Sequence, residues 1–185
     1  INSSIQLSER ERADDRLREQ ALQTYLDRMS ELLLKEHLAE PELGDKAKTV
    51  ARARTLTTLR GLDSGRKAVA LNFLYQSNLI SGDLPAIALV AVDLAGLNLD
   101  GAYLKDVNLV GAHLERTHFT QAQLIHAYLL GAHLERSYLD GANLVGAHLE
   151  GAYLKESHLE GAYLRDAGLM QVHLEEAHLE GAHLE

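Results

Sequence analysis

Leucine recurs at every fifth residue in the second half of this chain, and this spacing excludes both regular secondary structures. The series runs from Leu89 to Leu184, with Phe119 taking the same position once. On a helix, which turns by about 100° per residue, five residues advance about 500°, so the leucines would spread around the whole cylinder. In a straight strand, the odd period would place successive leucines on opposite faces. The chain must therefore turn a corner once per repeat, so that every leucine faces one interior.

The other positions of the repeat fit this interpretation. If the leucine is position i, position i−2 is mostly small, as at Ala112, with Val107 and Val172 as exceptions. Position i+2 is often glycine, which suits a corner because it tolerates positive φ. The predicted core of the second half is Leu94, Leu99, Leu104, Leu114, Phe119, Leu124, Leu134, Leu144, Leu154 and Leu164.

The repeats GAHLE, GAYLK, GANLV and GAYLR resemble the pentapeptide-repeat family, and the chain looks like a bacterial, cyanobacterial-type member with an N-terminal helical segment. The resemblance implies a right-handed quadrilateral β-helix, with four repeats in each coil and about five coils stacked at a strand spacing of about 4.8 Å. The family prefers Asp or Asn at position i−1, whereas this chain mostly has His or Tyr there. The expected fold is unchanged by this difference, but the surface is unusual.

The first half is predicted to be helical, with about three helices. A capping-box spacing at Ser8 and Glu11 and an apolar stripe beginning at Leu17 predict a first helix over 8–38, before Pro41. Further helices are expected over 45–60, ending at Gly61, and over 64–80, with Val69 on the apolar face. The resulting expectation is a mainly β fold with an α cap: a capping domain over 1–83 and a solenoid over 84–185. The cap would cover the open first coil.

The net charge of −9 lies entirely in the second half. Residues 1–85 carry 13 Lys and Arg against 13 Asp and Glu, whereas residues 86–185 carry 5 against 14. An acidic solenoid disfavours direct contact with nucleic acid or anionic membrane. No run approaches the roughly 18 apolar residues that span a bilayer. The chain as given is therefore expected to be soluble, and either cytoplasmic or membrane-tethered through an upstream anchor.

The outward position i+1 predicts two surfaces when the repeats are sorted by face. An apolar interaction stripe is expected on one side, where exposed apolar residues often mark contact sites: Val110, Ile125, Leu130, Val145 and Met170. An acidic face is expected on the other: Asp100, Asp140, Glu160 and Glu180. The basic residues between Asp45 and Lys67 are a third candidate, for anionic lipid headgroups if an anchor lies upstream, but the sequence favours a solvated face of the second helix.

Nine of the ten histidines lie in the repeats. If each coil has 20 residues, two pairs of these histidines lie beside each other on adjacent coils: His113 with His133, and His158 with His178. Such pairs could share a zinc or nickel ion with Glu115 or Glu135. The sequence favours the alternative, a solvated ladder of stacked rings in which Tyr138, Tyr153 and Tyr163 fill equivalent places. No metal, cofactor or catalytic residue is therefore predicted.

These observations predict a non-enzymatic scaffold for protein interaction, because a convex prism offers no pocket in which a nucleophile, a base and an orienting group would meet. The partner is another protein or a second copy, bound end to end or side by side. Two alternatives remain open. The resemblance implies one, an acidic DNA mimic that binds gyrase or another DNA-binding protein. The other is the soluble part of a membrane-anchored signalling or regulatory protein.

Overall fold

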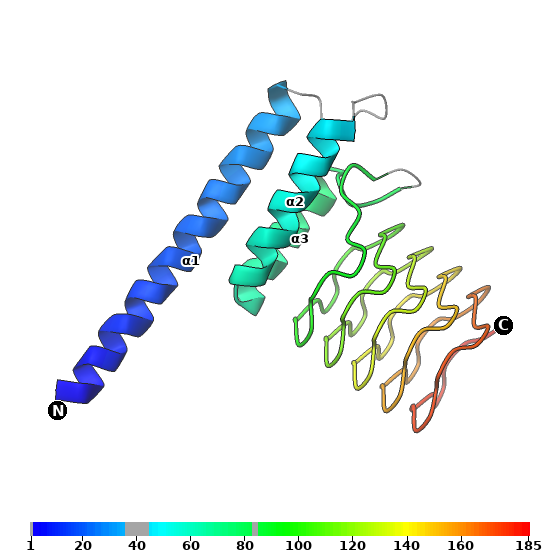
Figure 1. Ribbon diagram of the computed structural model, residues 1–185. Coiled ribbons are helices and arrows are strands. Elements are labelled where there is room, and N and C mark those ends of the chain that lie inside the picture. Colours follow the sequence, from blue (N-terminus) through cyan, green and yellow to red (C-terminus); the bar gives the residue numbers. More distant parts are fainter. Residues whose placement is uncertain (1, 36–44, 83–84) are drawn as a thin grey trace.

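The computed structural model describes residues 2–35, 45–82 and 85–185. Three helices, α1 (Asn2–Lys35), α2 (Asp45–Gly61) and α3 (Ser64–Gln76), precede a solenoid whose coils stack one after another toward the C-terminus. In Figure 1, α2 and α3 lie between α1 and the solenoid. No helix in the described part of the chain is both long and apolar enough to cross a membrane.

The helices pack through short apolar stripes. On α1 the buried residues Leu22, Tyr25 and Met29 recur at intervals of three and four, and on α2 Ala51, Thr55 and Leu59 recur at intervals of four. The side chain of Asp63 caps α3 by accepting a hydrogen bond from the backbone N–H of Arg66. Each stripe lies on the helix face that meets a neighbouring helix.

The prediction of three helices is confirmed, but several of its details are wrong. The first helix begins at Asn2 rather than Ser8, and the third ends at Gln76 rather than near Ile80. Leu17 and Val69 were expected on buried faces but are 63% and 51% exposed. The predicted end of the first helix near residue 38, and the domain boundary between residues 83 and 84, lie outside the described residues.

The helices cover the first coil and bond to it. Leu79, Ile80 and Ile87, which lead into the repeats, are all 0% exposed. Nε of Arg52 on α2 donates to the carbonyl oxygen of Ala88 at 3.0 Å, and Nζ of Lys67 on α3 donates to that of Asp93 at 3.2 Å. These bonds satisfy carbonyl groups at the start of the solenoid, an end that would otherwise expose unpaired backbone.

A left-handed residue forms the corner of every repeat. All i+2 positions from Ala91 to Gly181 have positive φ, whether they hold glycine, as at Gly131 (58°), or not, as at Arg136 (59°). The next residue closes the turn with a bond to the leucine carbonyl, as from Ala112 N to Leu109 O at 3.0 Å. The expected corner is therefore present in each repeat, including those that lack glycine.

Successive coils pair in parallel with an offset of 20 residues. The bridges join position i−1 on adjacent coils, from Asp93 with His113 to Tyr163 with His183. Their register places four five-residue repeats in one coil. Among the described residues the pairing consists of isolated bridges rather than longer strands, so the strand content is lower than "mainly β" implied. The reason is that the turn takes part of every repeat and leaves only a short extended segment.

The interior of the solenoid is filled. All ten residues of the expected core, from Leu94 to Leu164, are at most 6% exposed. The small i−2 residues, such as Ala112 and Ala132, are 0% exposed and occupy the space beside the leucines. In the coil that ends the sequence, Leu184 is 56% exposed, since no further coil of the described chain covers it.

Candidate interaction surfaces

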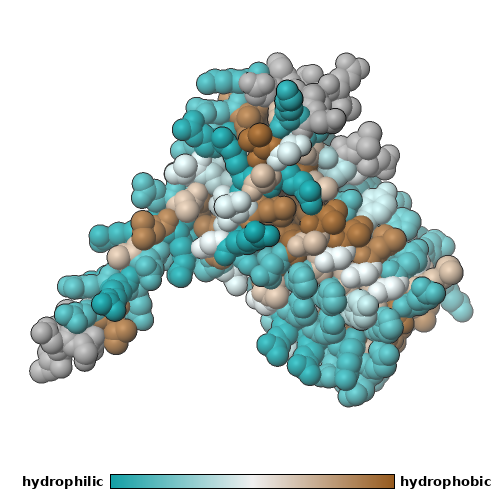
Figure 2. Space-filling view, in the orientation of Figure 1, coloured by the Kyte–Doolittle hydropathy of each residue, from teal (hydrophilic) through white to brown (hydrophobic). Residues whose placement is uncertain are grey.

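The interaction stripe occupies two neighbouring corners of the solenoid. Val110 and Leu130 stack on adjacent coils at one corner, and Ile125 and Val145 stack at the next. Leu130 is 38% exposed, and the three other side chains are half-buried. Figure 2 shows hydrophobic residues in a band that runs from the helices along the upper side of the solenoid, above a hydrophilic lower side.

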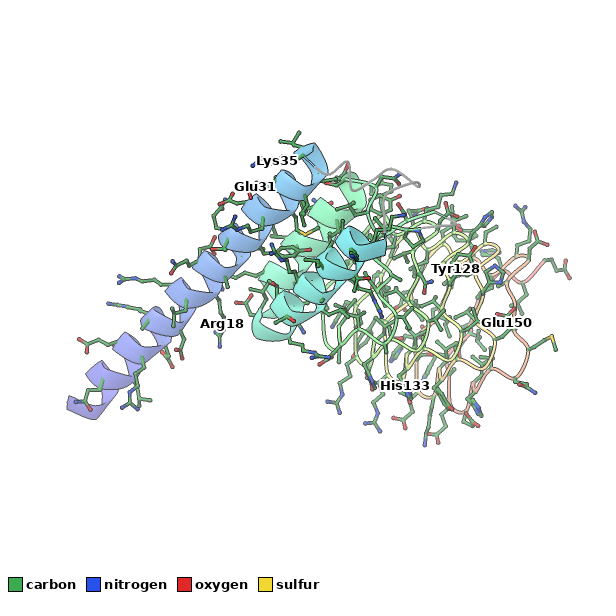
Figure 3. All side chains as sticks on the ribbon, turned by 45° about the horizontal axis from the view of Figure 1, so that its top comes forward. Arg18, Glu31, Lys35, Tyr128, His133 and Glu150 are labelled. Atoms are coloured by element: carbon green, nitrogen blue, oxygen red, sulfur yellow. The ribbon has the colours of Figure 1, made fainter. Side chains whose placement is uncertain are left out.

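Met170 is set apart from the rest of the stripe. It lies at the same corner as Leu130 but two coils away, and Glu150 stands between them. Glu150 lies against Gly168, in the space that a side chain at that position would occupy, and its Oε1 is 3.8 Å from Nδ1 of His148. Figure 3 shows Glu150 and Tyr128 on the solenoid surface and His133 on a different side. The continuous apolar part of the stripe is therefore Val110, Ile125, Leu130 and Val145.

The four acidic-face residues share one corner, with Thr120 between Asp100 and Asp140. Burial, and then the neighbouring carboxyl group of Glu160, raise the pKa of Asp140. Burial opposes ionisation of Glu160 as well, but hydrogen bonds to its own backbone, to Asp140 and to His158 outweigh it and lower the pKa of Glu160. The corner thus concentrates negative charge at Glu160.

Aromatic rings stack in ladders along the i−1 positions. His113 lies on His133 with ring centroids 5.1 Å apart, and His158 lies on His178 at 4.9 Å, so both predicted pairings are confirmed. Tyrosines continue the same columns: Tyr138 stacks on His158 at 5.0 Å and Tyr153 on His133 at 4.8 Å. Each histidine in these columns therefore contacts a ring above or below it.

Several histidines also contact the carboxylate two residues later. Nδ1 of His133 is 3.3 Å from Oε1 of Glu135, and Nδ1 of His158 is 3.4 Å from Oε1 of Glu160. Two groups place ligand atoms from three residues within 4.8 Å of one another. These groups are Glu115 with His133 and Glu135, and His158 with Glu160 and His178.

The basic residues of α2 and α3 are partly engaged within the chain. Arg66 contacts Asp15 at 2.7 Å, Glu19 at 2.9 Å and also Asp63, and these carboxylates, Asp15 first, raise the pKa of its guanidinium. Arg52 and Lys67 bond to the solenoid, as described above. This use of the cations weakens the prediction of a surface for anionic lipid.

A groove that the sequence did not predict lies between α2 and the first coils. Its volume is about 710 Å³, and both helix and solenoid line it. Its charged lining residues are Arg60, Asp93, Glu115, Arg116, Glu135 and Arg136. The groove depends on how the helices sit against the coils, and no sequence motif carries that information.

Sequence reasoning also missed the role of Glu160 beside two histidines. Glu160 follows His158 by two residues and precedes His178 by 18, so the 20-residue register contained the signal. The sequence analysis considered only Glu115 and Glu135 as carboxylates for such a group, and favoured a ladder without metal.

Three solved structures illustrate the similarity of this chain to known proteins. A pentapeptide repeat protein from the Arabidopsis thaliana thylakoid lumen is 24% identical, over 51% of this chain and 59% of that one, with a TM-score of 0.40. Rfr23 from the cyanobacterium Cyanothece 51142 is 32% identical, over 50% and 87%, with a TM-score of 0.28. HetL from Nostoc sp. strain PCC 7120, involved in heterocyst differentiation regulation, is 28% identical, over 52% and 59%, with a TM-score of 0.21. This chain therefore spans less than two thirds of the first and third proteins. The comparison with curated proteins gave no match.

The family described as pentapeptide repeats matches the second half of the chain in 8 copies. The matched segments are residues 88–121, 117–155 and 147–185, which together cover more than half of the sequence. Cyanobacterial members are among the similar structures. The five-residue period, the corner in each repeat and this match agree, and the chain belongs to the pentapeptide-repeat family.

Proposed function

We propose that this chain is a non-enzymatic scaffold for protein interaction, built as a helical cap of residues 1–83 on a right-handed quadrilateral solenoid of about five coils over residues 84–185. The main support is the apolar stripe on two adjacent corners, where Leu130 is 38% exposed. Isolated apolar side chains are common on protein surfaces, whereas neighbouring ones that stack on successive coils form a contact patch.

A non-enzymatic role agrees with the chemistry of the groove. Its lining holds no Ser, Thr, Cys, Tyr or Lys, and its three carboxylates, from Asp93, Glu115 and Glu135, share the groove with Arg60, Arg116 and Arg136. The solenoid interior is filled by side chains at most 6% exposed from Leu94 to Leu164, so it offers no space for a substrate. The remaining outward surface is suited to contact with another macromolecule.

The partner in this proposal is another protein or a second copy of the chain. The test begins with light scattering of the purified chain, followed by capture of partners from an extract of the source organism and binding of the purified partner. The variant Leu130→Glu with Val145→Glu is expected to lose the interaction, because two charges would enter its apolar centre. The control Ala95→Glu with Gln121→Glu adds the same charge at exposed positions of the two other corners.

The two double variants test the location of the contact surface separately from the scaffold function. If both bind the partner as the unmodified chain does, the stripe is not the contact surface. If the unmodified chain is monomeric and no captured protein binds saturably after purification, the scaffold proposal is wrong.

A DNA mimic is the second candidate, and the acidic corner favours it. Asp140, Glu160 and Glu180 stack without an ion pair to Lys or Arg within the described chain. This row of carboxylates nevertheless has a low charge density. One carboxylate per coil places one negative charge in about 4.8 Å, whereas duplex DNA carries about one in 1.7 Å. A supercoiling assay with gyrase tests this candidate: the absence of inhibition at micromolar protein would exclude it for that enzyme.

A further inference from the structure

The histidine ladder approaches the acidic corner most closely in the group formed by His158, Glu160 and His178. Oε1 of Glu160 is 3.4 Å from Nδ1 of His158 on its own coil and 3.8 Å from Nδ1 of His178 on the next. The two imidazoles stack with centroids 4.9 Å apart. Two imidazole nitrogens and one carboxylate oxygen therefore converge across two coils.

We propose that His158, Glu160 and His178 bind one transition-metal ion of the Zn²⁺ class, and that this ion links two adjacent coils. The inference is independent of the proposed function. Two histidines and one carboxylate with a water molecule are an ordinary ligand set for tetrahedral zinc. Imidazole selects such borderline metals over Mg²⁺ and Ca²⁺, which prefer oxygen ligands.

The distances from both imidazoles to Glu160 are close to those around such an ion, whereas the two rings must turn. Metal–ligand distances of about 2.0 to 2.2 Å with tetrahedral angles require ligand atoms to lie about 3.4 Å apart. The separation of His158 from Glu160 already has this value, at 3.4 Å, and that of His178 from Glu160 is 3.8 Å. The stacked rings, now 17° from parallel, must tilt toward each other to aim both nitrogens at one ion. Both side chains are more than a third exposed, at 36% and 51%, so they have room to turn.

The surroundings also favour a cation. Oε2 of Glu160 is shielded from solvent and has no hydrogen-bond partner, which is costly for a carboxylate oxygen, and Oε2 of Glu115, Glu135 and Glu150 is in the same state. Asp140 and Glu180 lie at the same corner on the coils on either side, and glycines, Gly141, Gly161 and Gly181, follow the three acids. Within the described chain, no Lys or Arg pairs with these carboxylates.

The second group, Glu115 with His133 and Glu135, offers a useful contrast. Arg116 and Arg136 directly follow its two glutamates and line the same groove. Their fixed positive charges oppose a bound cation. Only one histidine belongs to this group, since His113, although its Nδ1 is 3.4 Å from Oε1 of Glu115, lies outside it, so the ligand set is also less suited to zinc. The two groups therefore serve as site and internal control.

Calorimetric titration of the untagged full-length chain with ZnCl₂, in a buffer that does not bind metals, tests the proposal. The expected result is one saturable site, with Mg²⁺ giving no heat. His178→Gln and Glu160→Gln are expected to weaken Zn²⁺ binding at least about 10-fold, since loss of even an outer-shell partner weakens metal sites by about that factor. Glutamine occurs naturally at the same repeat position at Gln123, so His178→Gln is compatible with the fold.

Two control variants give the test its specificity. His118→Gln removes an imidazole from the same column but beside Thr120, and His133→Gln removes the histidine of the second group. Both controls are expected to bind Zn²⁺ as the unmodified chain does, and all four variants should unfold at similar temperatures without metal. The absence of binding heat up to millimolar Zn²⁺, or an equal loss in His118→Gln and His178→Gln, would overturn the proposal. A loss confined to His133→Gln would overturn it as well, because the ion would then belong to the other group.

Discussion

The hydroxyl group of Tyr25 on α1 lies 2.8 Å from Oγ1 of Thr55 on α2, and both side chains are buried. Thr55 uses its only proton in a 2.9 Å bond to the carbonyl oxygen of Ala51, so Tyr25 is the donor of the pair. Burial raises the pKa of Tyr25 to about 12. A buried hydrogen bond therefore joins α1 and α2.

Tyr25→Phe should destabilise the chain by about 0.5 to 1.5 kcal/mol, the usual net value of one hydrogen bond. The loss is limited because Thr55 keeps its bond to Ala51. Urea unfolding measures the change. Tyr75→Phe on α3 is the control, since the half-buried Tyr75 hydroxyl makes no hydrogen bond among the described residues. Equal effects of the two substitutions would show that the Tyr25 bond has no special part in holding the helices together.

Leu144 lies in the interior of the solenoid and is 0% exposed, so its substitution tests whether this interior is packed and dry. Leu144→Ala should cost about 2 to 5 kcal/mol through the cavity it leaves. Leu144→Asp should cost more, because it also buries a charge without a partner. The measurement is thermal unfolding followed by circular dichroism.

Leu184→Asp makes the same change at the same repeat position, but that side chain is 56% exposed. Leu184→Asp should lower the midpoint of thermal unfolding far less than Leu144→Asp does. A midpoint for Leu144→Asp close to that of Leu184→Asp would contradict a packed interior.

The sequence predicted the solenoid well because a single repeated constraint determines it. Once each fifth residue must face inward and four repeats close a coil, the pairing of His158 with His178 follows by arithmetic, and the rings do stack. The helical half carries no such repeated constraint. The spacing from Leu17 indicated an amphipathic helix but not which of its residues meet a partner: Leu17 is 63% exposed, although Asp15 and Glu19 on either side of it contact Arg66 of α3.

The directions in which side chains point could not be predicted from the sequence either. The register placed Glu160 one corner from both histidines, but only the coordinates show its Oε1 near both Nδ1 atoms. Likewise, glycine at many corners indicated positive φ there, but the same conformation at Arg136 follows from the closed geometry of the coil rather than from residue preference.

Ser137 and Ser157 allow a paired test of polar groups in the core. Both are 0% exposed at position i−2, where alanine is common. Oγ of Ser157 donates to the carbonyl oxygen of Leu154 at 2.7 Å, whereas Oγ of Ser137 has no partner. Ser137→Ala should therefore raise stability by up to about 1 kcal/mol, because it removes a buried hydroxyl group without a hydrogen bond.

Ser157→Ala is the matched substitution and should lower stability by about 0.5 to 1.5 kcal/mol, because it removes a bond. Guanidinium unfolding of both variants gives the two free-energy differences. If they have the same sign, the two hydroxyl groups are not in different environments and the contrast fails.

The ion pair of Arg136 with Glu156 joins adjacent coils and predicts a dependence on pH. Nε of Arg136 is 2.7 Å from Oε2 of Glu156, and this bond is the main reason that the pKa of Glu156 is lowered. A lowered pKa in the folded state means that the stabilisation is present above the unfolded pKa, 4.5, and is lost as the pH falls through the folded value.

Thermal unfolding should thus show that the ion pair of Arg136 with Glu156 stabilises the chain slightly at neutral pH, and that this stabilisation fades in acid. Because the pair is exposed, salt should reduce it too. A double-mutant cycle of Arg136→Gln and Glu156→Gln isolates this term, and a coupling energy that stays constant from neutral pH to below the folded pKa would refute its electrostatic origin.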